Sequence, residues 1–225
     1  MTIVASGEIS LGVNATTTRS VACELDRSGT SQICMDETQV RTLAARTTAA
    51  SAICMNDFYG KTSIPTTLGQ NYRGGYYSGT ITSPANYYLI VAPNSSGCAC
   101  CQWKTVSTQT TFGINTACNL DNGYWNTFTY LNNTTHPAGN YTATRSISGF
   151  SDWYLPARNE LNVLYQNKSS MPFGQGYAGD RYWTSTSCYF CSAHAKCMGG
   201  YGPGNNYGTG VLTQLSLRAV RRVSF

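Results

Sequence analysis

Charged residues are scarce in this sequence. They make up only 11% of the 225 residues, against roughly 25% in an ordinary soluble domain. Fifteen Lys and Arg against ten Asp and Glu give a net charge of +5, and the only small basic group is Arg218, Arg221 and Arg222. Because nucleic-acid binding needs a basic patch or stripe, we expect no nucleic-acid partner.

Long apolar runs are also missing. None approaches the roughly 20 residues that cross a bilayer, so no membrane span is expected. Residues 1–8 (MTIVASGE) contain neither the basic nor the apolar segment of a secretory signal, so we expect no such signal. Hydrophobic residues still form 41% of the chain and aromatic residues 12%. That is enough for one core and a small satellite module, which excludes a disordered chain.

Residues typical of catalytic centres are few. The two histidines are His136, which precedes a proline in a polar stretch, and His194. Cys191 and His194 could form a nucleophile pair, but no orienting acid accompanies them. No cluster of Asp and Glu suggests a calcium site, and the glycine run at 199–204 lacks the Lys-Ser/Thr ending of a phosphate loop. We therefore predict a protein that is not an enzyme and that has no cofactor and no metal.

Cysteine, by contrast, is abundant, and all ten cysteines are disulfide candidates. They are Cys23, Cys34 and Cys54, followed by Cys98, Cys100, Cys101, Cys118, Cys188, Cys191 and Cys197. So many cysteines are typical of an oxidising compartment, and an odd number in each part allows a bridge between parts or between chains. Four donors between residues 188 and 197 also resemble a zinc set, but structural zinc sites draw their ligand pairs from separate elements.

Two parts of different texture predict two modules. We place the boundaries at residues 1–61, a linker at 62–69, and a second domain at 70–225. In the first part a short pattern recurs twenty residues apart, at 33–36 (ICMD) and 53–56 (ICMN). It predicts two small strand-to-helix units, with a short helix over about 37–45, that bury too little apolar area to stand alone.

The second part is rich in short strands and turns, with one convincing helix. The expected strands lie at 87–92, 182–185 and 215–223, and the helix lies within 155–165. Leu161, Leu164 and Tyr165 have helical spacing, and Pro156 marks the entry. Trp153 and Trp183 are expected in the core. Many strands around one helix predict an α+β fold.

Three motifs of the second part carry a resemblance to a known family. Residues 151–161 (SDWYLPARNEL), 182–186 (YWTST) and 218–222 (RAVRR) resemble the family of the C-terminal domain of the Legionella collagen-like adhesin. The resemblance implies a C-type-lectin-like layout, a role in surface adhesion, and a homo-oligomer with a trimer favoured. That family usually has serine at the helix N-cap, where this chain has Ala157, so a cap worth about 1 kcal/mol is expected to be missing.

The first part resembles a short module found at the start of tail and other virion structural proteins of tailed phages. The matching residues are 7–12 (GEISLG), 36–45 and 57–61 (DFYGK). Together the two resemblances imply a bacteriophage virion protein, a tail fibre, tip or baseplate-associated subunit. Residues 1–61 would contact other virion proteins and the second domain would bind a receptor. Such a protein is made in the host cytoplasm and works outside it, where cysteines oxidise.

Other hypotheses stay open at this point. The chain could instead be a capsid or neck decoration protein, or a host-encoded carbohydrate-binding adhesin. An oxidoreductase that uses the Cys188 and Cys191 pair is a third class, because the formylglycine-generating enzymes are C-type-lectin-like.

The resemblance to C-type-lectin-like proteins places a binding surface in the segment 188–207, which we expect to be a long loop. Its candidate binding residues are Tyr189, His194, Tyr201, Asn205, Asn206 and Tyr207. Aromatic rings stack on the apolar faces of sugars and amides bond to hydroxyls. We therefore expect a host surface glycan or protein as partner, with packing against a sister subunit as the alternative.

Overall fold

The structure is a computed structural model that describes residues 21, 25, 33–35, 37–44, 52–58, 64–82, 85–106, 117–171, 181–187, 192–197 and 206–224. For residues 192–197 and 206–208 it describes the backbone alone. The chain divides into two compact units, unit 1 (Met1–Thr66 and Gln70–Arg73) and unit 2 (Thr67–Gly69 and Gly74–Phe225). The assignment of residues 1–61 to an attachment module followed by a linker at 62–69 stays a prediction.

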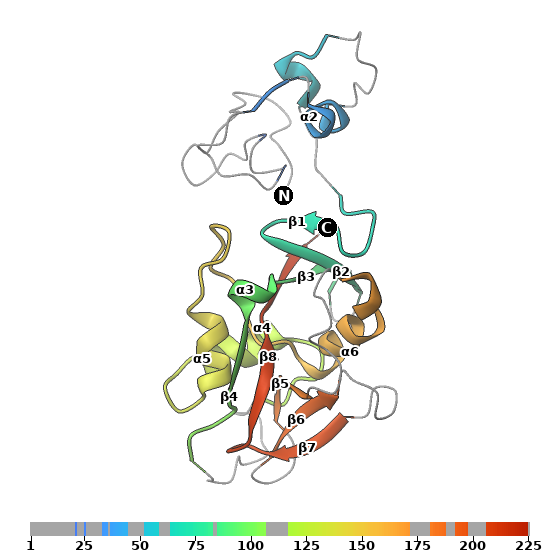
Figure 1. The fold of residues 1–225 in the computed structure, drawn as a ribbon. Helices are drawn as coiled ribbons and strands as arrows, with labels where there is room; N and C mark the ends of the chain where they lie inside the picture. Colours follow the sequence, from blue (N-terminus) through green and yellow to red (C-terminus); the bar gives the residue numbers. More distant parts are fainter. Residues whose placement is uncertain are drawn as a thin grey trace. The chain divides into compact units, whose positions relative to one another are not determined.

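Unit 1 has a small core of its own. Its described helical elements are α2 (Thr38–Leu43), which is shorter than the expected helix, and the 3-10 turn η1 (Met55–Phe58) (Figure 1). The buried residues of this core are Val21, Val40, Leu43, Ala44 and Phe58. The expectation that this part buries too little apolar area to stand alone stays a prediction.

The repeated pattern of unit 1 forms the same turn twice. The N–H of Cys34 donates to Oε1 of Glu37 at 3.2 Å, and the N–H of Cys54 donates to Oδ2 of Asp57 at 2.9 Å. In both copies the N–H of the acidic residue returns to the cysteine carbonyl. The isoleucine and methionine beside each cysteine pack on the core, while each cysteine is exposed. The two copies of the sequence pattern therefore also share one local structure.

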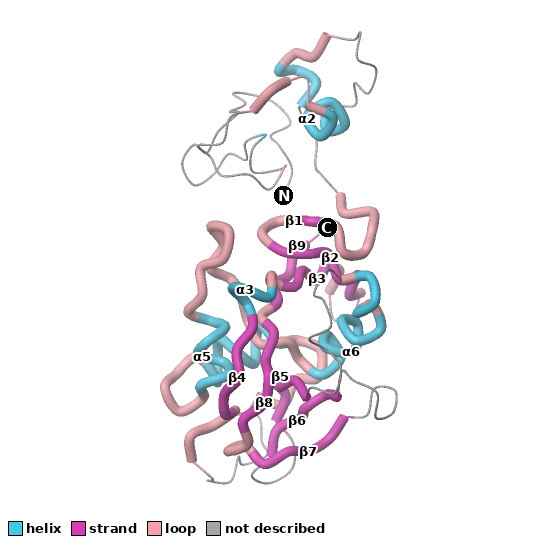
Figure 2. Tube along the Cα trace, in the orientation of Figure 1, coloured by secondary structure: helices cyan, strands magenta, loops and turns pink. Residues whose placement is uncertain are grey.

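Unit 2 confirms the α+β fold class (Figure 2). One sheet of unit 2 has the order β2 (Gly75–Ile81), β3 (Tyr87–Val91) and β9 (Val220–Ser224). The short strand β1 (Asn71–Tyr72) belongs to unit 1. The other has the order β4 (Cys98–Gln102), β8 (Gln214–Arg218), β5 (Arg181–Ser187), β6 (Ser192–Cys197) and β7 (Asn206–Gly210). The β5 and β8 pair is parallel, whereas β8 pairs with β4, and β9 with β3, in antiparallel fashion.

The expected strand at 215–223 is in fact two strands that belong to different sheets. Ala219 separates β8 from β9, and its N–H donates to the Gly97 carbonyl at 2.8 Å. Its carbonyl accepts from the N–H of Ala92 at 3.0 Å. A Cβ on Gly97 would collide with the side chain of Ala92, so this close approach requires glycine. Alternating hydrophobicity could not show that the chain changes sheets at one residue.

The described part of unit 2 also contains six helical elements. They are α3 (Asn94–Gly97), α4 (Gly123–Asn126), the π-helix η2 (Thr127–Leu131), α5 (Pro137–Ala143), α6 (Arg158–Gln166) and the 3-10 turn η3 (Lys168–Ser170). Only α6 was expected from helical spacing. No helix in the described part of the chain is long and apolar enough to span a membrane.

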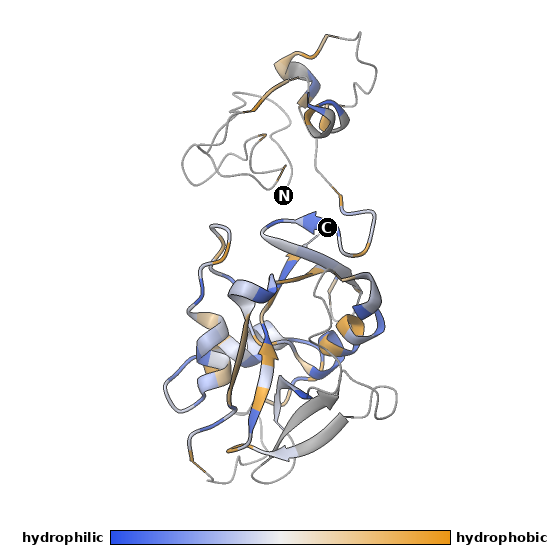
Figure 3. Ribbon diagram, in the orientation of Figure 1, coloured by the Kyte–Doolittle hydropathy of each residue, from blue (hydrophilic) through white to orange (hydrophobic). Residues whose placement is uncertain are grey.

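Two apolar clusters lie among the described residues of unit 2. One contains Leu161 and Leu164 of α6 together with Leu89 of β3, and the other is built around Trp103 and Trp183. Figure 3 shows apolar residues on α6 and β8. Trp153 and Trp183 are both fully buried, so the expectation that they belong to the interior is confirmed.

Candidate binding surface

The segment 188–207, which we expected to be one long loop, is partly strand. Residues 192–197 form β6, and Asn206 and Tyr207 begin β7. The two strands pair so that His194 lies opposite Gly208 and Tyr207 opposite Ala195. The expectation of a continuous loop is therefore wrong, because backbone pairing takes up these residues. Tyr189, Tyr201 and Asn205 lie outside the described residues, and binding by any of the six candidates stays a prediction.

A second polar surface, which the sequence did not predict, forms around residues 119–122, here called the Asn119 turn. Oδ1 of Asn119 accepts the N–H groups of Asp121 and Asn122 at 2.8 and 2.9 Å. An asparagine side chain that bonds the backbone two and three residues on fixes a tight turn locally. The side chain of Asn119 is exposed, and those of Asp121 and Asn122 are partly exposed.

A fully buried asparagine holds the Asn119 turn from beneath. Oδ1 of Asn126 accepts the N–H of Asn119 at 3.1 Å, and its Nδ2 donates to the carbonyl of Asn119 at 2.7 Å. The same Nδ2 reaches Oγ of Ser185 at 3.1 Å, and the hydroxyl of Thr186 donates to the Asn119 carbonyl at 2.9 Å. Both peptide groups of Asn119 are thus bonded to α4 or β5, which makes the turn rigid.

The start of α6 joins the same network. The N–H of Asn159 donates to the Leu120 carbonyl at 2.9 Å, and the N–H of Arg158 donates to the hydroxyl of Thr186 at 3.1 Å. Ala157 does occupy the N-cap and makes no side-chain bond there. The N–H groups of Arg158 and Asn159, which have no acceptor within the helix, nevertheless donate to Thr186 and Leu120. The predicted loss of about 1 kcal/mol at this cap is therefore offset.

Glu160 is the buried carboxylate at the centre of this region. Its Oε1 accepts the hydroxyls of Tyr87 at 2.7 Å and Tyr154 at 2.8 Å. Its Oε2 accepts the N–H groups of Ala157 at 2.8 Å and Gly123 at 3.0 Å. Burial raises the pKa of Glu160, and the four donors oppose that rise. The carboxylate ties β3, α4 and α6 together, and both of its oxygens are occupied by protein donors.

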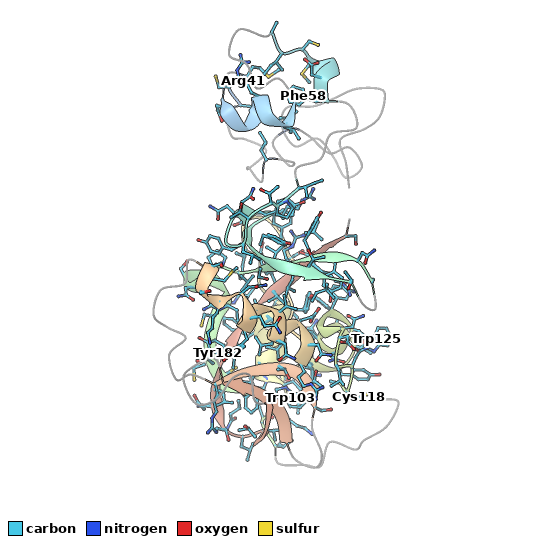
Figure 4. The ribbon with its side chains drawn as sticks, turned by 90° about the vertical axis from the view of Figure 1, so that its right-hand side faces the viewer. Arg41, Phe58, Trp103, Cys118, Trp125 and Tyr182 are labelled. Atoms are coloured by element: carbon cyan, nitrogen blue, oxygen red, sulfur yellow. The ribbon has the colours of Figure 1, made fainter. Side chains whose placement is uncertain are left out.

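The helix α4 presents Trp125 to solvent. Oδ1 of Asn122 accepts the N–H of Trp125 at 2.9 Å, which caps the helix. The same oxygen accepts Nη1 of Arg222 at 3.1 Å, and that guanidinium lies 4.5 Å from the ring centre of Tyr124. The Trp125 side chain is 53% exposed, and Figure 4 shows it at the periphery of unit 2.

A groove of about 220 Å³ borders the Asn119 turn. It is lined by Thr80, Ile81, Thr82, Asp121, Asn159, Glu160 and Val163. Oδ1 of Asp121 accepts Nδ2 of Asn159 at 2.6 Å, so the carboxylate is held in place. The groove therefore offers hydroxyl, amide and carboxylate groups beside two aliphatic side chains.

Six of the ten cysteines have side chains that the structure describes. Cys34, Cys54, Cys98, Cys100, Cys101 and Cys118 are free. Burial, together with neighbouring Cys100, raises the pKa of Cys101 to about 11, which makes that thiol a weak nucleophile at neutral pH. Cys23, Cys188 and Cys191 are not among the described residues, and of Cys197 the structure describes the backbone. Within the described ranges no three His, Cys, Asp or Glu side chains gather as metal ligands.

Comparisons with protein-family models and with curated proteins give no match for this chain. The two family resemblances in the sequence motifs therefore stay predictions. The segment that sequence reasoning missed is 119–126 (NLDNGYWN). Its Asn and Asp residues before a glycine are typical of a turn, and that signal could have identified the Asn119 turn. No local sequence pattern, however, could show that Asn126 is buried and that Trp125 is exposed.

Proposed function

We propose that this protein is a bacteriophage virion structural protein, a tail fibre, tip or baseplate-associated subunit. In this proposal unit 2 is a lectin-like receptor-binding domain, and residues 1–61 contact other virion proteins. Copies of the chain associate as a homo-oligomer, with a trimer favoured. The protein acts by binding rather than by catalysis.

The rigid Asn119 turn is the observation that carries the receptor-binding role. Recognition sites depend on loops that a rigid scaffold holds in one conformation. Here the buried side chains of Asn126 and Glu160 hold the turn and the start of α4 in place. Asn119 is exposed, Asp121 and Asn122 are partly exposed, and Trp125 follows three residues after Asn122 with 53% of its surface exposed. A surface with few charges, many amides and aromatic rings binds through hydrogen bonds and ring contacts.

The separate core of unit 1 supports its role as an attachment module. Its described part contains five buried hydrophobic side chains, with the isoleucines and methionines of the two repeats packed against them. A module of this kind gains stability from a partner that covers it. Neighbouring virion proteins or sister copies would supply that cover.

Mass spectrometry of purified particles tests the proposal. Particles banded in a density gradient should contain this chain at a constant copy number, and antibody labelling in electron microscopy should place it on the tail. Label on the capsid or neck would support a decoration protein instead. Absence from particles, with the protein present on cells that carry no phage, would show a host adhesin and overturn the virion assignment.

A further inference from the structure

We propose that Trp125 is the stacking platform for a neutral sugar ring of a surface polysaccharide, with the Asn119 turn supplying the hydrogen bonds. The inference rests on the proposed receptor-binding function and names its ligand class and its site. It moves the site away from the segment 188–207 to the surface formed by residues 119–125.

Trp125 differs from the other tryptophans in its environment. Trp103, Trp153 and Trp183 are at most 1% exposed, whereas Trp125 is 53% exposed. Their indole N–H groups donate to the carbonyls of Thr184, Phe150 and Cys101. A large aromatic ring left in water loses the burial free energy that the other three gain. The exposed ring is available for an apolar ligand face.

The backbone of Trp125 is held in place although its ring is exposed. Its backbone N–H is bonded to Asn122, and the next residue is the buried Asn126. On the other side Tyr124 packs against Phe128, with ring centres 4.6 Å apart, and against Tyr154 at 5.8 Å. On a fixed backbone a tryptophan has only two side-chain torsions to order on binding, which costs little entropy and suits recognition of a single sugar face.

The polar neighbours of Trp125 suit hydroxyl groups. Asn119 is exposed, and Asp121 and Asn122 are partly exposed. Sugar rings present apolar C–H faces and a rim of hydroxyls, and amides both donate to and accept from hydroxyls. A protein partner would bury a wider apolar patch, whereas the described ranges offer one large exposed ring here.

The charges favour a neutral sugar over an acidic one. Asp121 places a carboxylate on the same turn. Arg222 lies against the neutral amide of Asn122, and its positive charge offsets the negative charge of Asp121. Arg221 is neutralised by a two-point ion pair with Asp152 at 2.8 and 3.0 Å. The turn therefore offers no excess of positive charge to attract an acidic sugar.

Intrinsic fluorescence tests the proposal with the full chain. The protein is first applied to an array of neutral and acidic bacterial surface polysaccharides, and the best-retained neutral polysaccharide is then used in solution. Because three of the four tryptophans are buried, acrylamide quenching reports mainly on Trp125. We expect the polysaccharide to protect this fluorescence from quenching.

Two variants and a matched control sharpen the test. Trp125→Ala should weaken binding at least about tenfold, while Leu212→Ala, which removes another exposed apolar side chain (42% exposed), should bind as the wild type does. Asp121→Asn, which removes the negative charge of the turn, should retain acidic polysaccharides that the wild type rejects. Far-UV circular dichroism and unfolding curves check that the variants are folded.

The outcomes separate this inference from the proposed function. Polysaccharide binding that Trp125→Ala leaves unchanged would overturn the Trp125 site and leave receptor binding in place. An array that retains no polysaccharide would overturn the sugar ligand, while presence in particles would still support the virion assignment. Preference for acidic polysaccharides would overturn the charge argument and with it the neutral ligand.

Discussion

The duplicated turns of unit 1 and the Asn119 turn of unit 2 are held in different ways. In unit 1 a carboxylate three residues on accepts the cysteine N–H, at Glu37 and again at Asp57, so each turn closes on itself. The Asn119 turn also bonds itself, but its peptide groups reach Asn126 and Thr186. A turn held by short-range bonds can form from its own residues alone. A turn held by long-range bonds forms only when the rest of the domain is folded.

Removing the buried carboxylate is the strongest way to test this difference. Glu160→Gln replaces one acceptor oxygen by an NH2 group, so either two hydroxyls or two backbone N–H groups lose their acceptor. Each buried donor left without a partner costs about 1–3 kcal/mol, and we expect unit 2 to lose roughly 3 kcal/mol of unfolding free energy. Urea unfolding followed by tryptophan fluorescence measures it, because all four tryptophans lie in unit 2.

Glu37→Gln is the matched control in unit 1. Its side chain is half-buried and accepts one local bond, and glutamine keeps an acceptor oxygen. The fluorescence transition should stay within about 0.5 kcal/mol of the wild type. Equal effects of the two variants would refute the distinction between locally held and domain-held turns.

The same distinction explains what the sequence could and could not predict. Helix α6 and strand β3 follow from short-range periodicity, and the repeated turns follow from a pattern that is visible in the sequence. The split at Ala219 between β8 and β9, the buried Asn126 and the exposed Trp125 depend on residues far away in the chain. Hydrophobic periodicity holds no information about such partners, so the candidate site emerged only from the fold.

A half-buried histidine gives unit 2 a sensitivity to acid. Burial, together with the charge of Lys104, lowers the pKa of His136 to about 4, and the imidazole lies edge-on to Trp103 with ring centres 5.2 Å apart. The unfolded chain protonates near pH 6.5 and so binds more protons than the folded one between pH 6.5 and about 4. The stability that neutral His136 contributes is complete above pH 6.5 and is lost as the pH falls toward 4.

The effect is measured as the difference between the wild type and His136→Gln. Because the imidazole is half-buried, we expect the wild type to lose about 1–2 kcal/mol relative to the variant between pH 7 and 4. Glu160, whose pKa is raised by burial, contributes with the opposite sign and is common to both proteins. Parallel stability curves for the two proteins across this range would show that His136 does not titrate at a lowered pKa.

The smallest effect is expected where a turn of unit 1 keeps its acceptor but loses its charge. Asp57→Asn retains an oxygen for the Cys54 N–H, but a bond to a neutral acceptor is roughly half as strong as one to a carboxylate, so the loss should be about 0.5 kcal/mol. Amide hydrogen exchange at Cys54 should quicken about twofold, and Asp57→Ala, which removes the acceptor, should quicken it further. Since the bond spans three residues, the exchange rates of unit 2 should not change. Faster exchange in unit 2 would mean that these turns, too, depend on distant parts of the chain.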